Sequence, residues 1–254
     1  MKKLFIAFSF LTLLPVRLKD ITVEDIKNSV IFFPWVGAFE GLASFLAVFI
    51  CKNFLPVEFL ALLVLIVIFL IRGIFHLDGL SDTFDALFYK SSGNGDFDRK
   101  KRLTIMKDTT VGVGGVCAIF MDLLFKFILL KFTFTNLFYF WHLIFTFSFS
   151  RWALLPLMYH GKPAKKEGLG AIFVGKLSFK HILLGSILPF SLLTFYIFKT
   201  KKLIFLFFPV FLYLTSFFIN KICIKKFGGI TGDNLGATVE ISEIIGLFFW
   251  GFYG

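Results

Sequence analysis

Residues 55–75, LPVEFLALLVLIVIFLIRGIF, form a long apolar stretch that runs directly into the acidic stretch HLDGLSDTFD at residues 76–85. A helix of about 20 mainly apolar residues crosses the hydrocarbon core of a bilayer, so the first stretch predicts a transmembrane helix. The second stretch places carboxylates where that helix leaves the membrane. Together they predict membrane-spanning helices with a polar site at one end.

Five further stretches meet the same length requirement, at residues 31–50, 111–130, 134–159, 181–198 and 203–223. Two terminal segments, 4–16 and 241–253, are apolar but short, because 13 residues of helix cover only about 20 Å. Each is expected to lie in the interface, re-enter the membrane or span it imperfectly. The sequence therefore predicts an all-α polytopic integral membrane protein, with six secure transmembrane helices plus short apolar N- and C-terminal segments, in a single membrane-embedded catalytic domain (residues 1–254).

The composition supports this fold class. The chain is 57% hydrophobic and only 17% charged, whereas soluble domains are typically ~45–50% apolar, so a soluble or disordered protein is excluded. With the helices above, 18 Lys and Arg residues fall on the N-terminal side of the membrane and 5 on the other side. By the positive-inside rule the first side is cytoplasmic, which explains the net charge of +11 without a nucleic-acid partner. We expect a protein of the cytoplasmic (cell inner) membrane, surrounded by lipid, with its site facing the cytoplasm.

The acids after residue 75 are the strongest local signal. Asp78, Asp82 and Asp85 are spaced at i, i+4 and i+7, so they share one face if the helix continues through them. Like charges at this spacing repel one another unless a cation lies between them, and hard carboxylate oxygens favour Mg²⁺. The alternative is an acidic helix face in contact with solvent. His76 has a catalytic or phosphate-contacting role, or it is a neutral interfacial side chain.

The next cytoplasmic loop carries a basic run at residues 99–102, followed by Lys107 and Asp108. Basic side chains beside a metal site suit a pyrophosphate or nucleotide, although the run also fits simple anchoring at the membrane surface. Lys107 and Asp108 lie nearer the following helix and are the better functional candidates.

The last cytoplasmic loop reads GGITGDNLG at residues 228–236 and leads to Glu240 and Glu243, one helical turn apart. Thr231 and Asp233 are candidates for binding phosphate, ribose or a second metal. The alternative is an ordinary turn followed by acids that complement the helix dipole.

Several charges fall inside the apolar stretches. Glu40 lies in the middle of the first, where an ionised carboxylate costs roughly 2.5–3.5 kcal/mol on insertion scales. It should therefore be protonated, paired or cavity-facing, with Arg72 and Arg151 as candidate partners. Arg151 could also extend its side chain to the membrane surface, or point into the bundle to hold an anionic substrate. Asp122 and Lys126 are four residues apart and are expected to pair.

The chain resembles the cobalamin synthase (adenosylcobinamide-GDP ribazoletransferase) family. The order and spacing of its motifs carry this resemblance over nearly the whole chain: LTLLPV at 11–16, Phe33-Pro34 and Gly37, HLDGLSDTFD at 76–85, IMKD at 105–108, EGLG at 167–170, GGITGDNLGA at 228–237, and Glu240 and Glu243. Three positions depart from the family pattern, at Thr104, Thr110 and Glu40.

The resemblance implies an activity. The family joins adenosylcobinamide-GDP to α-ribazole, or to its 5′-phosphate, and releases GMP, which is the last step in assembling the cobalamin nucleotide loop. It implies Mg²⁺ as cofactor. It is also compatible with a homo-oligomer or with partners in a larger cobalamin-assembly complex. Such transfers depend mainly on positioning and on neutralising charge.

The resemblance also suggests roles for the candidate residues. Asp78, Asp82 and Asp85 would hold Mg²⁺ on the pyrophosphate, and one of them or His76 would deprotonate the attacking ribose hydroxyl. The substrate-binding residues are expected to be Lys107, Asp108, Arg151, Thr231 and Asp233. Glu240 and Glu243 are expected as further metal ligands.

Two other classes stay open on the sequence. A CDP-alcohol phosphotransferase also uses helix-borne aspartates for transfer in membranes, but Ser81-Asp82 stands where its pattern has Ala-Arg. A cation transporter would also place acids inside helices, although here the acids gather at cytoplasmic ends rather than at the midplane.

Overall fold

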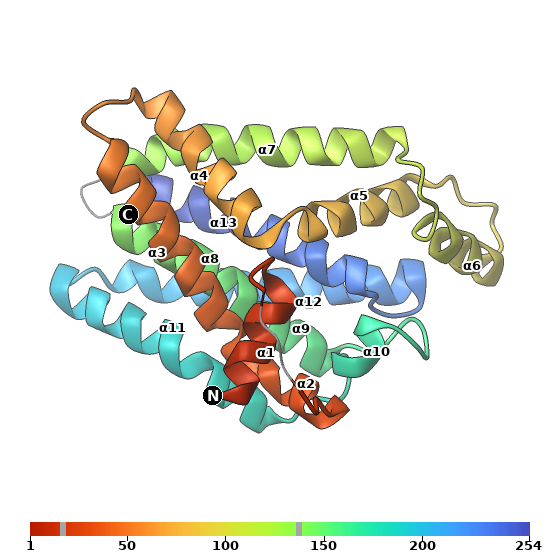
Figure 1. Ribbon diagram of the computed structural model, residues 1–254. Helices are drawn as coiled ribbons and strands as arrows, with labels where there is room; N and C mark the ends of the chain where they lie inside the picture. Colours follow the sequence, from red (N-terminus) through yellow and green to blue (C-terminus); the bar gives the residue numbers. More distant parts are fainter. Residues whose placement is uncertain (16–18, 136–138) are drawn as a thin grey trace.

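The computed structural model describes residues 1–15, 19–135 and 139–254, and it is a bundle of helices joined by turns and loops (Figure 1). In chain order the helices are α1 Lys2–Leu11, α2 Val23–Ser29, α3 Phe33–Cys51, α4 Val57–Arg72, α5 Phe75–Phe88, α6 Gly95–Ile105, α7 Val113–Phe134, α8 Tyr139–Trp152, α9 Leu154–His160, α10 Leu169–Phe173, α11 Phe179–Thr200, α12 Phe207–Phe227 and α13 Gly232–Tyr253, with 3-10 turns at Val30–Phe32 and Leu203–Leu206. These described residues contain no β-strand. The prediction of an all-α polytopic membrane protein is confirmed.

Five helical segments are long and apolar enough to cross a membrane, and the bent pair α4–α5 would make a sixth. The five are the segment Val23–Cys51, which includes α3, and the helices α7, α11, α12 and α13. Their outer faces carry exposed apolar side chains such as Phe120, Ile187 and Phe211. In a bilayer these side chains contact lipid.

The two ends of the chain differ from the prediction. Residues 241–253 are the second half of α13, a helix of 22 residues, so the prediction of a short C-terminal segment is wrong. The helix starts earlier because Thr231 caps it, and residues 232–240 continue it. At the other end α1 has only 10 residues, about 15 Å, which is too short to span; Val16 lies outside the described residues.

The stretch predicted as a helix at 134–159 forms two helices, α8 and α9, that meet at Ala153; residues 136–138 lie outside the described part. All side chains of α8 from His142 to Trp152 are buried. This helix is therefore enclosed by the others rather than exposed to lipid.

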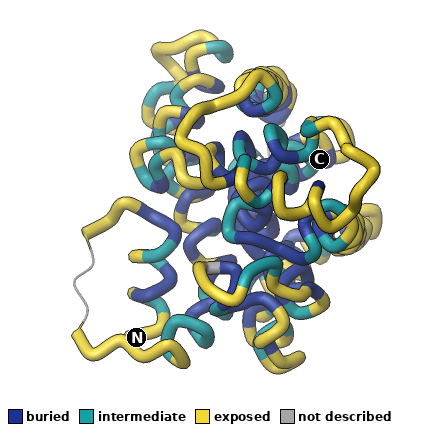
Figure 2. The backbone as a smooth tube through the Cα atoms, turned by 90° about the vertical axis from the view of Figure 1, so that its right-hand side faces the viewer, coloured by how far each residue is buried: buried dark blue, intermediate teal, exposed yellow. Residues whose placement is uncertain are grey.

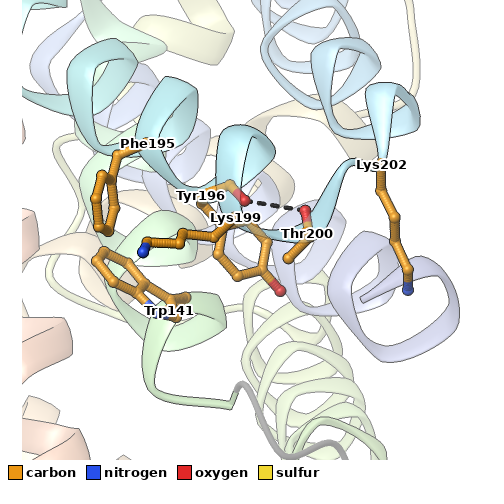
Figure 3. Close-up of a pocket in the computed structure, with 6 residues that line it drawn as sticks. All are labelled: Trp141, Phe195, Tyr196, Lys199, Thr200 and Lys202. Carbon is orange, nitrogen blue, oxygen red and sulfur yellow. Dashed lines mark hydrogen bonds between the residues drawn. The ribbon is translucent and has the colours of Figure 1, made fainter.

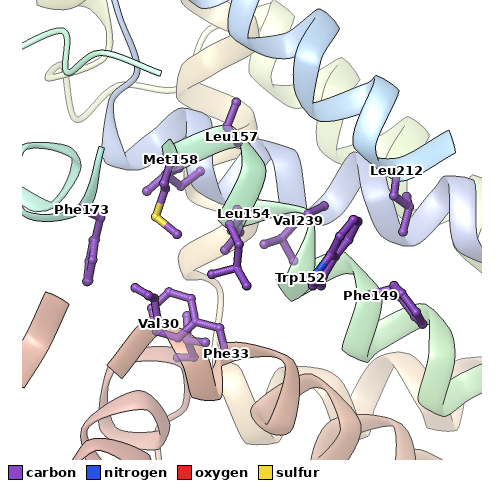
Figure 4. Packing of buried hydrophobic residues seen from close by; sticks show 14 of the residues in the cluster. Val30, Phe33, Phe149, Trp152, Leu154, Leu157, Met158, Phe173, Leu212 and Val239 are labelled. Atoms are coloured by element: carbon purple, nitrogen blue, oxygen red, sulfur yellow. The ribbon is translucent and has the colours of Figure 1, made fainter. Parts of the chain in front are cut away.

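The centre of the bundle is formed by α8 and α13, which pack on each other, while α13 also packs on α5 and α7. Figure 2 shows buried residues at the centre and exposed residues towards the periphery. The main apolar cluster joins α3, α8, α9, α10, α12 and α13, through side chains such as Phe33, Trp152, Leu154, Phe173 and Val239 (Figure 4). Because lipid is as apolar as these side chains, they stabilise the bundle within the membrane by close van der Waals packing.

The chain bends by 96° between α4 and α5. The break lies at Gly73, whose φ is +68° and ψ −150°, a conformation that side-chain-bearing residues rarely adopt. The acidic stretch therefore does not continue the axis of α4. Instead α5 turns to lie against α13 and α7, and this turn determines where its carboxylates lie.

Replacing Gly73 should strain the bend. In Gly73→Ala the new Cβ would adopt the unfavourable dihedral angles and meet the Leu13 side chain at 3.2 Å. We expect a loss of about 1–3 kcal/mol in stability, measured as a lower thermal midpoint in detergent. Gly95→Ala is the matched control, because a Cβ there meets nothing within 4 Å. Equal midpoints for both variants would contradict the assignment of strain to Gly73.

Candidate active site

The backbones of α5 and α13 touch near the start of each helix. A Cβ on Gly79 would lie 2.7 Å from the carbonyl oxygen of Asp233, and a Cβ on Gly236 would lie 3.2 Å from the carbonyl oxygen of His76. Only glycine permits this approach at position 79, and a Cβ at position 236 would make a tight contact. The contact brings Asp78 and Asp82 of α5 next to Asp233 of α13.

Hydrogen bonds fix the start of α13 in this position. The Thr231 hydroxyl accepts from the Asn234 N–H at 3.2 Å, and Asn234 Oδ1 accepts from the Thr231 N–H at 3.0 Å, which is a reciprocal cap. Asn234 Nδ2 also donates to Thr83 Oγ1 at 3.1 Å. Thr231 is buried, so the structure places its hydroxyl in the helix cap, whereas the sequence suggested a substrate contact.

A second loop adds a lysine that the sequence analysis missed. The Ile230 N–H donates to the Lys162 carbonyl at 2.8 Å, and the Ala164 N–H donates to the Ile230 carbonyl at 3.0 Å. This pairing brings Lys165 into a pocket of about 190 Å³ with Asp233. No local pattern around Lys165 signals this position, because a long-range backbone pairing creates it.

The electrostatics show that these groups act on one another. Burial lowers the pKa of Lys165, and Lys107 lowers it further, while Asp233 and Asp82 oppose the shift. Asp82 in turn interacts with Asp78, Asp233 and Lys165. The structure therefore brings together Asp78, Asp82, Asp233, Lys165 and Lys107, which we call the acid–lysine site.

Asp108 lies in the exposed loop between α6 and α7. Its carboxylate accepts from the Thr110 N–H at 3.0 Å and from the Thr110 hydroxyl at 2.8 Å, and these bonds lower its pKa. It stays ionised and accessible, but its bonds serve the local turn.

Asp85 caps the next helix. Its two carboxylate oxygens accept from the backbone N–H groups of Gly112, at 2.7 Å, and Gly115, at 2.8 Å, which are orphan donors at the start of α7. The prediction that Asp85 is the third metal ligand therefore gains no support from its geometry, which assigns the carboxylate to the cap of α7.

Seven charged side chains form a buried network away from these acids. Its members are Glu40 of α3, Arg72 of α4, Asp122 and Lys126 of α7, Arg151 of α8, and Glu240 and Glu243 of α13. Each is at most 3% exposed. We call this set the ionic network.

The ionic network explains the charges inside the apolar stretches. Arg151 donates to Glu40 at 2.5 Å and also to Glu243, and Arg72 lies 3.9 Å from Glu40. The prediction that Glu40 is paired with these arginines is confirmed. Asp122 and Lys126 pair at 3.1 Å as expected.

The ionic network also contains three residues that the sequence predicted to bind metal or substrate. Arg72 contacts Glu243 at 2.5 Å and Glu240 at 3.0 Å, and Lys126 contacts both glutamates. Because cations already surround Glu240 and Glu243, the geometry does not favour them as metal ligands. Arg151 is fully buried and is enclosed by carboxylates rather than open to a substrate.

A cavity of about 420 Å³ adjoins the acid–lysine site. His76 and Asp78 of α5 and Gly232 and Asp233 of α13 line it, together with residues 9–13 and apolar side chains of α3, α9 and α10. Gly232 and Asp233 also line the smaller pocket that holds Lys165. The two spaces therefore meet at the start of α13.

Another cavity, of about 560 Å³, lies at the C-terminal end of α11 (Figure 3). Its lining consists of Trp141, Phe195, Tyr196, Lys199, Thr200 and Lys202. Among the described residues that line it there is no carboxylate, and aromatic and lysine side chains are typical of a membrane interface. The described lining of this cavity therefore lacks the combination of carboxylates and lysine that defines the acid–lysine site.

The fold and the site define a helical integral membrane protein in which carboxylates and a lysine meet beside the α5–α13 contact. Residues 3–251 match the family model of cobalamin-5-phosphate synthase. The chain belongs to this family.

Curated relatives agree with the family match. The chain is 44% identical to an adenosylcobinamide-GDP ribazoletransferase of Thermodesulfovibrio yellowstonii, over 96% of this chain and 93% of the relative. Proteins of the same name from Clostridium tetani (34% identical, 92% and 90% covered) and Clostridioides difficile (30% identical, 98% and 96% covered) also match. No solved structure matches the chain.

The lowered pKa of Lys165 predicts a pH dependence. An ammonium group is charged below its pKa, so wild-type activity should fall on the alkaline side at a lower pH than for an ordinary lysine, whose pKa is about 10.4. Lys165→Arg should move this fall to higher pH, because arginine stays charged. The measurement is the pH–rate profile, with Lys166→Arg as control. An unchanged alkaline limb in Lys165→Arg would show that this charge does not control the rate.

The ionic network predicts that substitutions of two of its members change the stability of the protein by very different amounts. Among the described residues it holds four carboxylates and three cations, so Arg151→Met increases the imbalance and Glu40→Gln removes it. Leaving a buried charge unpaired costs about 3–5 kcal/mol, which corresponds to roughly 10 °C in a chain of this size. We expect that loss for Arg151→Met and a much smaller change for Glu40→Gln, measured by thermal unfolding in detergent. Similar losses for both would contradict control by charge balance.

Proposed function

We propose that the protein joins adenosylcobinamide-GDP to α-ribazole, or to its 5′-phosphate, with release of GMP in the final assembly of the cobalamin nucleotide loop. Membership of the cobalamin-5-phosphate synthase family, and relatives named for this reaction, support the proposal. One observation locates the proposed reaction in the structure: the side chains of Asp78, Asp82 and Asp233 lie close to Lys165. Neither a CDP-alcohol phosphotransferase nor a transporter is supported by these matches.

The donor set of this site fits Mg²⁺. Among the described residues, no three His, Cys, Asp or Glu side chains already form a metal-binding group, but Mg²⁺ is usually held by one or two carboxylates together with substrate phosphates and water. Asp82 lies among Asp78, Asp233 and Lys165, and like-charged acids tolerate such proximity when a cation joins them. Asp78, Asp82 and Asp233 would hold the ion, which would neutralise charge on the pyrophosphate.

The chain's own groups account for the remaining steps. Lys165 and Lys107 attract the phosphate oxygens, and the start of α13 directs its positive dipole end to the same place. The ribose oxygen forms a bond to the phosphorus on the cobinamide side, the bond to the bridging oxygen breaks, and GMP leaves with that oxygen. Asp78, which is exposed at the cavity, accepts the hydroxyl proton, with His76 as the alternative base.

The site is proposed to face the cytoplasm. From the bend at Gly73, α5 runs towards α6 (Figure 1), and Lys165 belongs to the loop between α9 and α10. Helix α6 and the connection between α9 and α11 are the Lys-rich segments of the chain. The positive-inside rule assigns these segments to the cytoplasmic side of the membrane.

The test is a product assay. Purified protein in liposomes receives adenosylcobinamide-GDP, α-ribazole and Mg²⁺, and cobalamin and GMP are followed together. We expect equimolar products that disappear with EDTA. Asp82→Asn should lower kcat by at least about 100-fold, the scale of losing one electrostatic group in a transition state.

The matched control is Asp96→Asn, an exposed carboxylate on α6 at the same end of the bundle, which should retain activity. If folded wild-type protein makes neither product from α-ribazole or its phosphate, the proposed reaction is wrong. If it makes both and Asp82→Asn is unimpaired, the reaction stands and the site assignment fails.

A further inference from the structure

Three aromatic rings form part of the lining of the 420 Å³ cavity. Phe10 of α1, Phe33 of α3 and Phe173 of α10 contact one another, with ring centroids 6.0 Å apart for Phe10–Phe33, 5.3 Å for Phe10–Phe173 and 5.8 Å for Phe33–Phe173. Figure 4 shows Phe33 and Phe173, with Leu154 of α9, in the apolar cluster. Phe33 and Phe173 are buried and support Phe10, which is partly exposed and offers the ring on which a planar aromatic group can stack.

The polar lining of this cavity is unevenly distributed. The Thr12 hydroxyl donates to the Phe8 carbonyl at 2.6 Å, so it is used within its own turn. Apart from the exposed Ser9, the remaining polar side chains are His76, Asp78 and Asp233, which belong to the α5–α13 contact. The cavity is therefore apolar on the α1, α3 and α10 elements and acidic where it joins the site.

The neighbouring pocket continues this gradient. Gly232 and Asp233 line both spaces, and the second contains Lys165. A ligand that extends from one space to the other would have an aromatic end, a polar middle and an anionic end. A nucleoside linked to phosphate has this sequence of groups.

We infer that this cavity receives the aromatic base of α-ribazole, with the ribose at Gly232 and Asp233 and the reacting phosphorus towards Lys165. The inference rests on the proposed function and names the substrate part that the cavity selects. A cavity of about 420 Å³ lies near the lower end of the ~300–1,000 Å³ range for small ligands, so it suits a nucleoside rather than a corrin ring with its side chains. Guanine is disfavoured, because its amide and amino edges need hydrogen-bond partners that phenylalanine lacks, whereas the dimethylbenzimidazole base has a hydrocarbon edge.

The test separates the two substrates kinetically. Phe10→Ala should raise KM for α-ribazole on the order of tenfold, from lost stacking and burial, and leave KM for adenosylcobinamide-GDP unchanged. Phe5→Ala is the matched control, since Phe5 lies on the same helix, is exposed and does not line the cavity. It should change neither KM.

A second measurement uses wild-type protein and therefore does not depend on the variant's folding. The α-ribosides of dimethylbenzimidazole, benzimidazole and adenine are compared as acceptors, and kcat/KM should fall in that order. A raised KM for adenosylcobinamide-GDP in Phe10→Ala, or equal use of the adenine riboside, would overturn the inference while product formation keeps the proposed function. Absence of product from every acceptor would instead overturn the proposed function.

Discussion

The ionic network at the core of the bundle is the constraint on which the other contacts depend. Charges at membrane depth are costly unless they are paired, and here their partners come from α3, α4, α7, α8 and α13. No one of these helices can leave its position without leaving a charge unpaired. Arg72 belongs to this network and is followed directly by Gly73, so the network also fixes the point at which the chain turns into α5.

This arrangement divides the acids of the chain into two groups. Glu240, Glu243 and Asp85 have their oxygens engaged by cations or by backbone N–H groups, and they hold helices in place. Asp78 and Asp233 lie on the same helices, α5 and α13, but line the 420 Å³ cavity, and Asp82 is partly exposed beside them. His76 connects the groups, because it lines the cavity and its Nδ1 lies 4.0 Å from Glu240. The carboxylates of Asp78, Asp82 and Asp233 are therefore held in place by neighbouring acids whose contacts join the helices.

The sequence predicts the apolar helices and the acidic stretch because composition and length alone determine a membrane span. It predicts the pairing of Glu40 because an isolated buried charge is untenable. It cannot distinguish Asp85 from Asp82, since both fit the same helical spacing and only the approach of Gly112 and Gly115 separates them. Lys165 is likewise invisible, because its place depends on the backbone pairing of residues 162–164 with Ile230. Long-range contacts, rather than local pattern, choose which polar residues meet.

The position of the site also suits reactants that differ in polarity. An acid–lysine cluster at the midplane would require a large anionic substrate to cross lipid, where unpaired charge is unfavourable. Here Asp78 is exposed, and the 96° turn after Arg72 carries α5 against α13. Aromatic side chains of α1, α3 and α10 lie beside the carboxylates. The apolar lining and the charged side chains are then adjacent at Gly232 and Asp233. The bend at Gly73 makes this adjacency possible, because a straight continuation of α4 would carry the acids away from the start of α13.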